Sequence, residues 1–262
     1  MNIRTQPIRR IPAGIQRRLG YLVRGLPDRG FEYPADMDDG FRELHAACAP
    51  FTMTSVDRMY ALRQAVQYVV ANRVEGDIVE CGVWRGGSAM LAALALQAGP
   101  DDGRLVWLYD TFEGMTEPGP LDVRRADNFD VSAHWGEIAG DRKLEMFAYS
   151  SLDEVRENMT AAGVNEALLK YVVGPVEETI PSVVPSSISI LRLDTDWYES
   201  TRHELEHLWP MLSPGGVLIV DDYGCFAGSQ LAVDEFFEGR EDAPFLNRVD
   251  VGRVAVKAFP RA

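Results

Sequence analysis

The sequence contains little cysteine and no long uninterrupted apolar run. Three cysteines, Cys48, Cys81 and Cys225, occur among 262 residues, and no pair has C-x-x-C spacing. This argues against a disulfide framework and a cysteine zinc site, and it predicts a reducing, cytoplasmic location. The most apolar segment, 89–96, is much shorter than the roughly eighteen residues that a transmembrane helix needs. The first residues also lack the apolar core of a secretory signal.

An overall excess of positive charge is absent too. The formal net charge is -14, whereas a nucleic-acid-binding face needs an excess of Lys and Arg, so we exclude a nucleic-acid partner. The charge is unevenly distributed, because residues 1–30 contain seven Arg and one acidic residue. That segment therefore carries +6, and the remaining 232 residues carry -20.

Apolar residues in the basic segment 8–24 approximate one face of a helix, although prolines weaken its first half. They are Ile8, Ile11, Ile15, Leu19, Leu22 and Val23. We expect a partly ordered arm or an oligomer contact, and we expect the protein to form a homodimer or another homo-oligomer. Peripheral contact with an anionic membrane surface is a second interpretation, and a transit peptide is a third.

Strand and helix patterns alternate from residue 77 onward. The predicted strands are 77–83, 105–110, 171–174, 188–194 and 216–222, and residues 249–259 are predicted to form a closing strand or hairpin. The predicted helices are 54–72, 87–98, 151–162, 177–184, 199–212 and 229–237. Continuously apolar strands are typical of a parallel sheet covered on both faces. The predicted fold is therefore a doubly wound, Rossmann-like α/β sheet, whose ligands bind outside the carboxyl ends of its strands.

The sequence also predicts how the chain is divided. We expect residues 1–50 to form the basic N-terminal arm with a helical extension, and residues 51–262 to form the α/β domain. Residues 111–150 have no clean periodicity and are long for a connection within a compact domain. Such segments are usually lids or binding elements, so we expect this one to cover the ligand that the protein acts on.

A glycine-rich turn follows the first predicted strand and reads Glu80-Cys-Gly-Val-Trp-Arg-Gly-Gly-Ser88. Glycines allow the backbone to approach a ligand closely, and the next helix offers N–H groups to an anion. The dinucleotide pattern G-x-G-x-x-G fails because position 84 is Trp, which disfavours an oxidoreductase. Asp110 ends the second strand, where an acidic residue can bind ribose hydroxyls. Together these features predict a nucleoside site.

Acidic residues also follow two later strands. Asp194 and Asp196 end one strand, and Asp221 and Asp222 end the next. Because these strand ends should be neighbours, their carboxylates should converge, and uncompensated like charges in a cleft are costly. A divalent cation would offset that cost, and carboxylate oxygens suit Mg²⁺ or Ca²⁺ better than zinc.

Four motifs, in this order, resemble the macrocin O-methyltransferase family over about residues 50–240. They are Glu80–Ser88, Asp110-Thr-Phe-Glu-Gly114, Leu191-Arg-Leu-Asp-Thr-Asp-Trp-Tyr198, and Ser213-Pro-Gly-Gly216 followed by Val220-Asp-Asp-Tyr223. The resemblance implies a class I methyltransferase fold, S-adenosylmethionine as methyl donor, and Mg²⁺. Members of the family methylate sugar hydroxyls, so it implies an O-methyltransferase whose acceptor is a bacterial saccharide or a glycosylated natural product.

The resemblance also implies roles for individual residues. The expected metal ligands are Asp194, Asp221 and Asp222, and the expected donor-binding residues are Thr52, Met53, Glu80, Gly82, Gly86, Ser88 and Asp110. We favour Asp194 as the general base, with Asp196 as the alternative. His134, in the predicted lid, is a third candidate, although its position favours an ordinary surface histidine.

Three alternatives remain. The aspartate pattern also resembles catechol-type methyltransferases, whose lysine base follows the first metal aspartate by three residues, but that position here is Trp197. A catechol-like diol acceptor is therefore one alternative, and a non-catalytic nucleoside-binding module is another. The segment His203-Glu-Leu-Glu-His207 matches the H-E-x-x-H zinc-protease motif. It follows a buried strand in the predicted sheet, so we expect both histidines on the flank of a helix.

Overall fold

The computed structural model describes residues 33–259, so the predictions for the basic segment 8–24 lie outside the described residues. A seven-stranded sheet has the order β5-β2-β1-β6-β7-β9-β8. Its strands are β1 (Asp77–Cys81), β2 (Val106–Asp110), β5 (Leu169–Val173), β6 (Ile188–Leu193), β7 (Leu212–Val220), β8 (Asn247–Val249) and β9 (Gly252–Val256). The strands from β5 to β7 are parallel, and β9 runs antiparallel to both of its neighbours. The predicted doubly wound α/β fold is confirmed.

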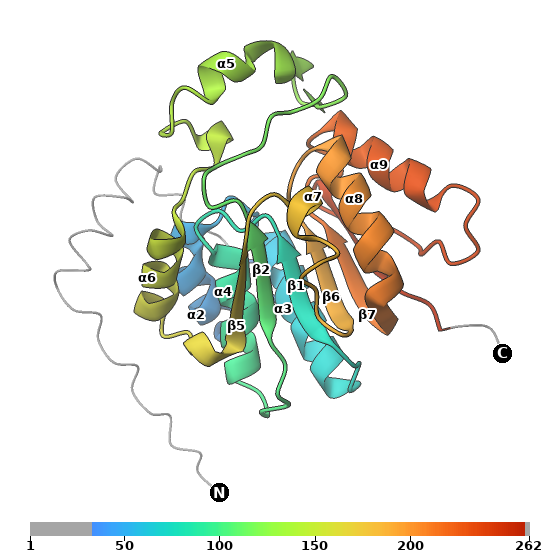
Figure 1. Cartoon of the computed structure of the whole chain (residues 1–262). Helices are drawn as coiled ribbons and strands as arrows, with labels where there is room; N and C mark the ends of the chain where they lie inside the picture. Colours follow the sequence, from blue (N-terminus) through green and yellow to red (C-terminus); the bar gives the residue numbers. More distant parts are fainter. Residues whose placement is uncertain (1–32, 260–262) are drawn as a thin grey trace, which may run out of the picture.

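Helices cover both faces of the sheet (Figure 1). The longer helices are α2 (Asp39–Cys48), α3 (Val56–Ala71), α4 (Gly87–Gln97), α6 (Leu152–Ala162), α8 (Tyr198–Leu208) and α9 (Ala227–Phe237), and the short ones are α5 (Trp135–Ile138), α7 (Val176–Thr179), η2 (Ala49–Phe51), η3 (Ser132–His134), η4 (Glu145–Phe147), η5 (Glu166–Leu168) and η6 (Trp209–Met211). Successive side chains of β1 point to opposite faces of the sheet, and each face has its own core. Ile78 packs in the core with α2, α3, α4 and α6, whereas Val79 packs in the core with α7, α8 and α9.

Two predicted helices end four or more residues earlier in the structure, and proline accounts for both. The helix expected over 199–212 ends at Leu208, because Pro210 cannot continue it, and the 3-10 turn η6 leads directly into β7. The helix expected over 177–184 is the single turn α7, which ends before Pro181.

Residues 111–150, which we call the cap segment, contain a two-stranded hairpin and three helical turns. The hairpin pairs β3 (Val123–Arg124) with β4 (Phe129–Asp130). Val131, Ile138 and Phe147 form a small separate core with Trp197. The cap segment lies above the carboxyl ends of the parallel strands (Figure 1).

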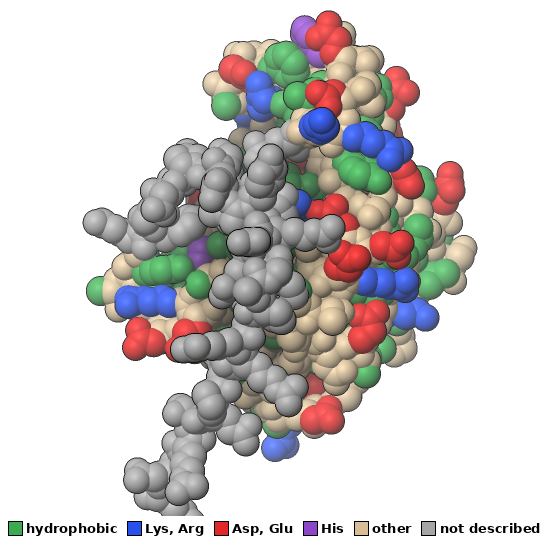
Figure 2. Space-filling view, turned by 90° about the vertical axis from the view of Figure 1, so that its left-hand side faces the viewer, with side chains coloured by type: hydrophobic (Ala, Val, Ile, Leu, Met, Phe, Trp, Pro, Cys, Tyr) green, Lys and Arg blue, Asp and Glu red, His purple; other side chains and the backbone are tan. Residues whose placement is uncertain are grey.

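No helix within residues 33–259 is long and apolar enough to span a membrane. On the face seen in Figure 2, acidic side chains occur in separate groups with Lys and Arg among them. The negative charge visible there is therefore spread over the surface instead of forming one continuous patch.

Candidate functional site

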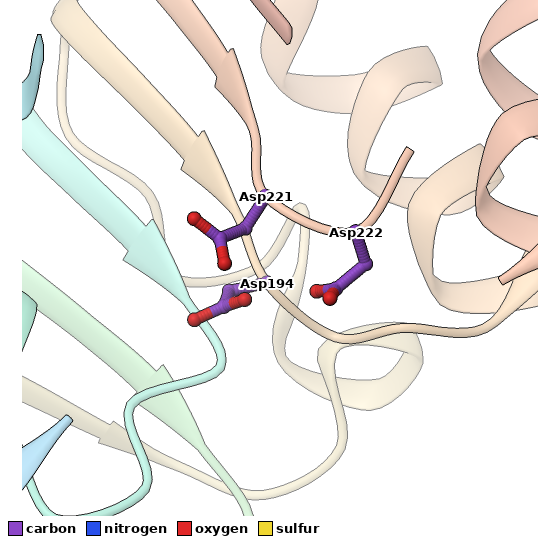
Figure 3. Close-up of side chains that lie close together, drawn as sticks. All are labelled: Asp194, Asp221 and Asp222. Atoms are coloured by element: carbon purple, nitrogen blue, oxygen red, sulfur yellow. The ribbon is translucent and has the colours of Figure 1, made fainter. Parts of the chain in front are cut away.

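Three aspartates converge at the carboxyl ends of β6 and β7 (Figure 3). The strands pair with Leu193 opposite Val220, so Asp194 and Asp221 are neighbours immediately after them. One carboxylate oxygen from each of Asp194, Asp221 and Asp222 lies within 4.8 Å of the other two. We call these three residues the aspartate cluster. The topology that the sequence predicted brings them together.

A buried arginine next to the cluster was not predicted from the sequence. The Arg192 side chain is 2% exposed, and its Nη1 donates to Glu80 Oε1 at 2.7 Å and to Asp194 Oδ2 at 2.6 Å. Its Nη2 donates to Thr54 Oγ1 at 2.9 Å and lies 2.8 Å from Asp221 Oδ1. Arg192 thus links the end of β1 to two members of the cluster.

A second arginine reaches Asp221 from α3. Ser55 caps this helix, which places Arg58 in the first turn at the rim of the sheet. The Arg58 Nη1 group donates to Asp221 Oδ2 and, at 3.3 Å, to the Asp221 carbonyl oxygen. Its Nε lies 3.5 Å from Asp250 Oδ2 in the turn between β8 and β9. Both carboxylate oxygens of Asp221 therefore face a guanidinium group.

The cluster nevertheless has carboxylate oxygens that are available to bind a cation. Asp222 Oδ2 is buried without a hydrogen-bond partner, and Asp221 Oδ1 lacks the alignment of a hydrogen bond despite its ion pair with Arg192. Burial raises the pKa of Asp194 well above its usual range, a shift that Arg192 opposes and Asp221 and Asp222 increase. Burial likewise raises the pKa of Asp222, with a further contribution from Asp196. Hard carboxylate oxygens in this arrangement fit a divalent cation such as Mg²⁺.

Asp196 lies beside the cluster in the loop after β6. Its backbone is in the left-handed region, at φ 67°, which aspartate tolerates better than most residues. Burial raises the pKa of Asp196 to about 7, and a hydrogen bond with Asp222 opposes the shift. Among the described ion pairs, none involves Asp196, in contrast to Asp194.

A pocket opens next to the cluster, where β1, β2, β5 and β6 end. Its lining includes Gly82, Asp110, Thr111, Gly174, Asp194 and Thr195. Two predicted donor-binding residues therefore share one pocket with a member of the aspartate cluster. A ligand bound here would lie directly beside the candidate metal ligands.

The Asp110 carboxylate fixes the shape of the glycine-rich turn. Its Oδ2 accepts from the backbone N–H groups of Val83 at 2.7 Å and Trp84 at 3.0 Å, and its Oδ1 accepts from Phe112 at 2.7 Å. Trp84 has a φ of 47°, so this hydrogen bonding helps to hold a left-handed backbone in place. Asp110 therefore shapes one wall of the pocket in addition to lining it.

The other predicted donor-binding residues surround the same turn. Glu80 accepts from Ser88 Oγ as well as from Arg192, and both Glu80 and Ser88 are buried. Thr52 packs against the start of α4, where a Cβ at Gly87 would lie 2.7 Å from the Thr52 Cβ. Gly86 is the N-cap of α4 at φ 93°, and Met53 is half exposed.

Gly82 allows β1 and β6 to approach each other at the pocket floor. It has a φ of +84°, and a Cβ there would lie 2.0 Å from the Asp194 carbonyl oxygen. We expect Gly82→Ala to lower the free energy of unfolding by about 3 kcal/mol or more, as measured by urea denaturation. Gly163→Ala is the matched control, because Gly163 has the same φ with nothing within 4 Å. Equal losses in the two variants would contradict the close-approach argument.

The histidines singled out in the sequence contact other groups. His134 is exposed in the cap segment, where its ring stacks on Phe129. His203 Nε2 lies 3.0 Å from the Ile180 carbonyl oxygen, and Glu204 is fully buried and accepts from Thr195 Oγ1. Within residues 33–259, the one group of three or more potential metal-ligating side chains is the aspartate cluster. The H-E-x-x-H segment therefore lacks the arrangement of a zinc-protease site.

Comparison with known proteins agrees with this architecture. The model of the Macrocin-O-methyltransferase (TylF) family matches residues 25–257, which extends beyond the resemblance read from the motifs at both ends. The 8-demethyl-8-(2,3-dimethoxy-alpha-L-rhamnosyl)-tetracenomycin-C 4'-O-methyltransferase of Streptomyces olivaceus is 35% identical over 209 residues, covering 77% of this chain and 74% of that protein. The demethyldecarbamoylnovobiocin O-methyltransferase of Streptomyces niveus is 35% identical over 190 residues, covering 71% of this chain and 67% of that protein.

A solved structure shows the same likeness. The O-methyltransferase NovP superposes with a TM-score of 0.68 at 33% sequence identity, covering 80% of this chain and 83% of its own. Sequence, fold and the order of the motifs thus agree over most of the described residues. The chain belongs to the macrocin O-methyltransferase family.

Proposed function

We propose that the protein transfers a methyl group from S-adenosylmethionine to a sugar hydroxyl of a glycosylated natural product or bacterial saccharide, and that it requires Mg²⁺. The observation that carries this proposal is the position of the aspartate cluster beside the pocket of Gly82 and Asp110. A donor bound in the pocket and an acceptor bound at the cluster would be adjacent, as methyl transfer requires.

The names of the relatives support a glycoside acceptor. The Streptomyces olivaceus protein is named for a rhamnosyl-tetracenomycin, and that from Streptomyces niveus for demethyldecarbamoylnovobiocin. The cap segment lies above the strand ends and contributes Thr111, Met115 and Thr116 to the pocket lining. These three residues border the donor pocket, so we assign acceptor binding to the rest of the cap segment, whose half-buried Trp135 could stack on a sugar ring.

Different residues of the chain bind the donor, hold the metal and accept the proton. The glycine-rich turn and Asp110 bind and orient the donor, and the three cluster aspartates hold Mg²⁺. When bound, S-adenosylmethionine supplies an activated methyl group, and Mg²⁺ supplies positive charge that favours ionisation of a hydroxyl. Asp194 Oδ2 already accepts from Arg192, whereas Asp196 is in none of the described ion pairs. On this geometry we favour Asp196 as the group that receives the hydroxyl proton.

The catechol-like alternative finds less support. Trp197 occupies the position of the catechol-type lysine, is buried, and donates from Nε1 to the Thr116 carbonyl oxygen at 2.9 Å. Trp197 thus joins the body of the protein to the cap segment and offers no basic group to the acceptor.

A methylation screen tests the proposal. The full chain is incubated with S-adenosylmethionine, Mg²⁺ and a panel of glycosides bearing adjacent hydroxyls, with simple catechols alongside, and methylated products are identified by mass spectrometry. We expect a methylated glycoside, loss of turnover in EDTA, and recovery when Mg²⁺ is restored. Methylation of catechols alone would contradict the acceptor class, and full activity in EDTA would contradict the metal requirement.

A further inference from the structure

Asp221 is the member of the aspartate cluster that two arginines share. Arg192 lies 2.8 Å from its Oδ1, and Arg58 donates to its Oδ2. Both carboxylate oxygens of Asp221 are therefore already paired with positive charge. A cation entering the cluster has to compete with at least one of these guanidinium groups for Asp221.

The two arginines differ in how firmly they are held. The Arg192 side chain is 2% exposed and also binds Glu80, Asp194 and Thr54, so it has no room to withdraw. The Arg58 side chain is 12% exposed and reaches Asp221 from the first turn of α3. Arg58 is therefore the guanidinium group that a cation can displace from Asp221.

Alternative acceptors for Arg58 surround it. Its Nε donates to Ser55 Oγ at 3.3 Å and lies 3.5 Å from Asp250 Oδ2, and its Nη1 donates to the Asp221 carbonyl oxygen at 3.3 Å. If the Asp221 carboxylate turned toward a metal, Arg58 would keep three polar partners. The exchange would leave no unpaired buried charge, so its cost is small.

We infer that Arg58 acts as an internal cation that competes with the metal for Asp221 and so sets the metal concentration at which the site fills. This inference rests on the proposed function, because it assumes that the aspartate cluster binds Mg²⁺. Arg58 is in this sense a positioning residue, which acts on the metal through Asp221 and is not among the residues that line the pocket.

The inference predicts that a substitution beside the metal site strengthens metal binding instead of weakening it. Arg58→Gln removes a unit positive charge adjacent to a metal ligand while keeping a side chain that can bind Ser55 and Asp250. We expect the Kd for Mg²⁺ to fall by about tenfold or more, because like charges near a binding site oppose a cation. Arg58→Lys retains the charge, so its Kd should stay within about threefold of the wild-type value.

The measurement is isothermal titration of the full chain with Mg²⁺ alone, accompanied by the shift in Tm that Mg²⁺ produces. Arg63→Gln is the matched control, since Arg63 lies on the same helix, has a 14% exposed side chain and pairs with Asp38 at 2.7 Å. Its Kd for Mg²⁺ should equal the wild-type value. Any general destabilisation by loss of an α3 ion pair appears in this control too.

Each outcome decides the inference. Tighter binding in Arg58→Gln, with unchanged binding in Arg63→Gln, supports it. Unchanged or weaker binding in Arg58→Gln overturns the inference alone, since a wild-type protein that binds Mg²⁺ leaves the proposed metal site intact. If the wild-type chain binds no Mg²⁺, then the metal requirement of the proposed function and this inference both fail.

Discussion

Asp222→Asn should reduce methyl transfer by about a thousandfold or more, the largest effect that we expect from a single substitution. Asp222 is the best member of the cluster for this test, because its Oδ2 has no hydrogen-bond partner and none of the described ion pairs includes it. Asparagine keeps the shape of the side chain while removing the charge that would hold a dication. The measurement is kcat/KM with saturating Mg²⁺, together with Mg²⁺ affinity by titration.

Asp234→Asn provides the comparison for this variant. Asp234 lies on α9, the helix that follows the same strand, and accepts from the Tyr223 hydroxyl at 2.6 Å on the surface. Its substitution removes one exposed carboxylate without altering the cluster, so activity should stay near the wild-type value. If Asp222→Asn retained full activity, the assignment of the cluster as the metal site would be wrong.

Asp110→Asn should weaken the binding of S-adenosylmethionine by about a hundredfold. The carboxylate accepts three backbone N–H bonds, from Val83, Trp84 and Phe112. An amide has a single oxygen, so its NH₂ group would face at least one of these N–H donors and distort the turn. We also expect a loss of about 2 kcal/mol in the free energy of unfolding. Titration of the donor into the purified variant measures the first effect, and urea denaturation the second.

Asp77→Asn separates donor binding from stability. Asp77 begins β1, at the opposite end of the strand from the pocket, and accepts from Leu105 N–H at 2.9 Å and from Trp107 Nε1 at 2.8 Å. It should lose a comparable amount of stability while binding the donor normally. A similar loss of donor affinity in both variants would mean that Asp110 acts only through the general stability of the fold.

Periodicity and strand-end chemistry predicted the parts of the structure that depend on short-range rules. Parallel strands place their carboxyl ends at one edge, so acidic residues directly after β6 and β7 had to meet once the fold class was known. The same rule located Asp110 and the turn at Gly82 in one pocket. These residues could be predicted from the sequence because each stands at the end of a mainly apolar strand.

The arginines could not be found in this way. Arg192 is a single charge within an apolar strand, and its partner Glu80 lies 112 residues earlier in the chain. Their contact depends on the pairing register of β1 with β6, which places the two residues opposite each other. Arg58 is separated from Asp221 by 163 residues, and the contact depends on how α3 is rotated on the sheet. A charged residue inside an otherwise buried strand is the one signal that could have identified Arg192.

The cap segment was equally hard to derive. Its strands are two residues long and its helices span one turn, so none is long enough to produce a measurable period. Its stability comes from the core of Val131, Ile138 and Phe147, which is closed by Trp197 from the loop before α8. Contacts of this kind join distant parts of the chain and leave no local pattern.

The separate core of the cap segment has a consequence for how such enzymes diversify. Its hydrogen bonds to the sheet domain include three: Asp122 accepts from the Tyr198 N–H at 2.8 Å, the Arg125 N–H donates to the Cys225 carbonyl oxygen at 2.8 Å, and Trp197 Nε1 donates to the Thr116 carbonyl oxygen at 2.9 Å. Because the cap core includes Trp197, an exchange between relatives should keep that residue and the pocket residues Thr111, Met115 and Thr116. Under the proposed function, replacing the rest of the cap segment would alter the choice of glycoside while leaving the donor pocket in place. Chimeric enzymes with grafted caps are therefore a practical route to new acceptor specificities.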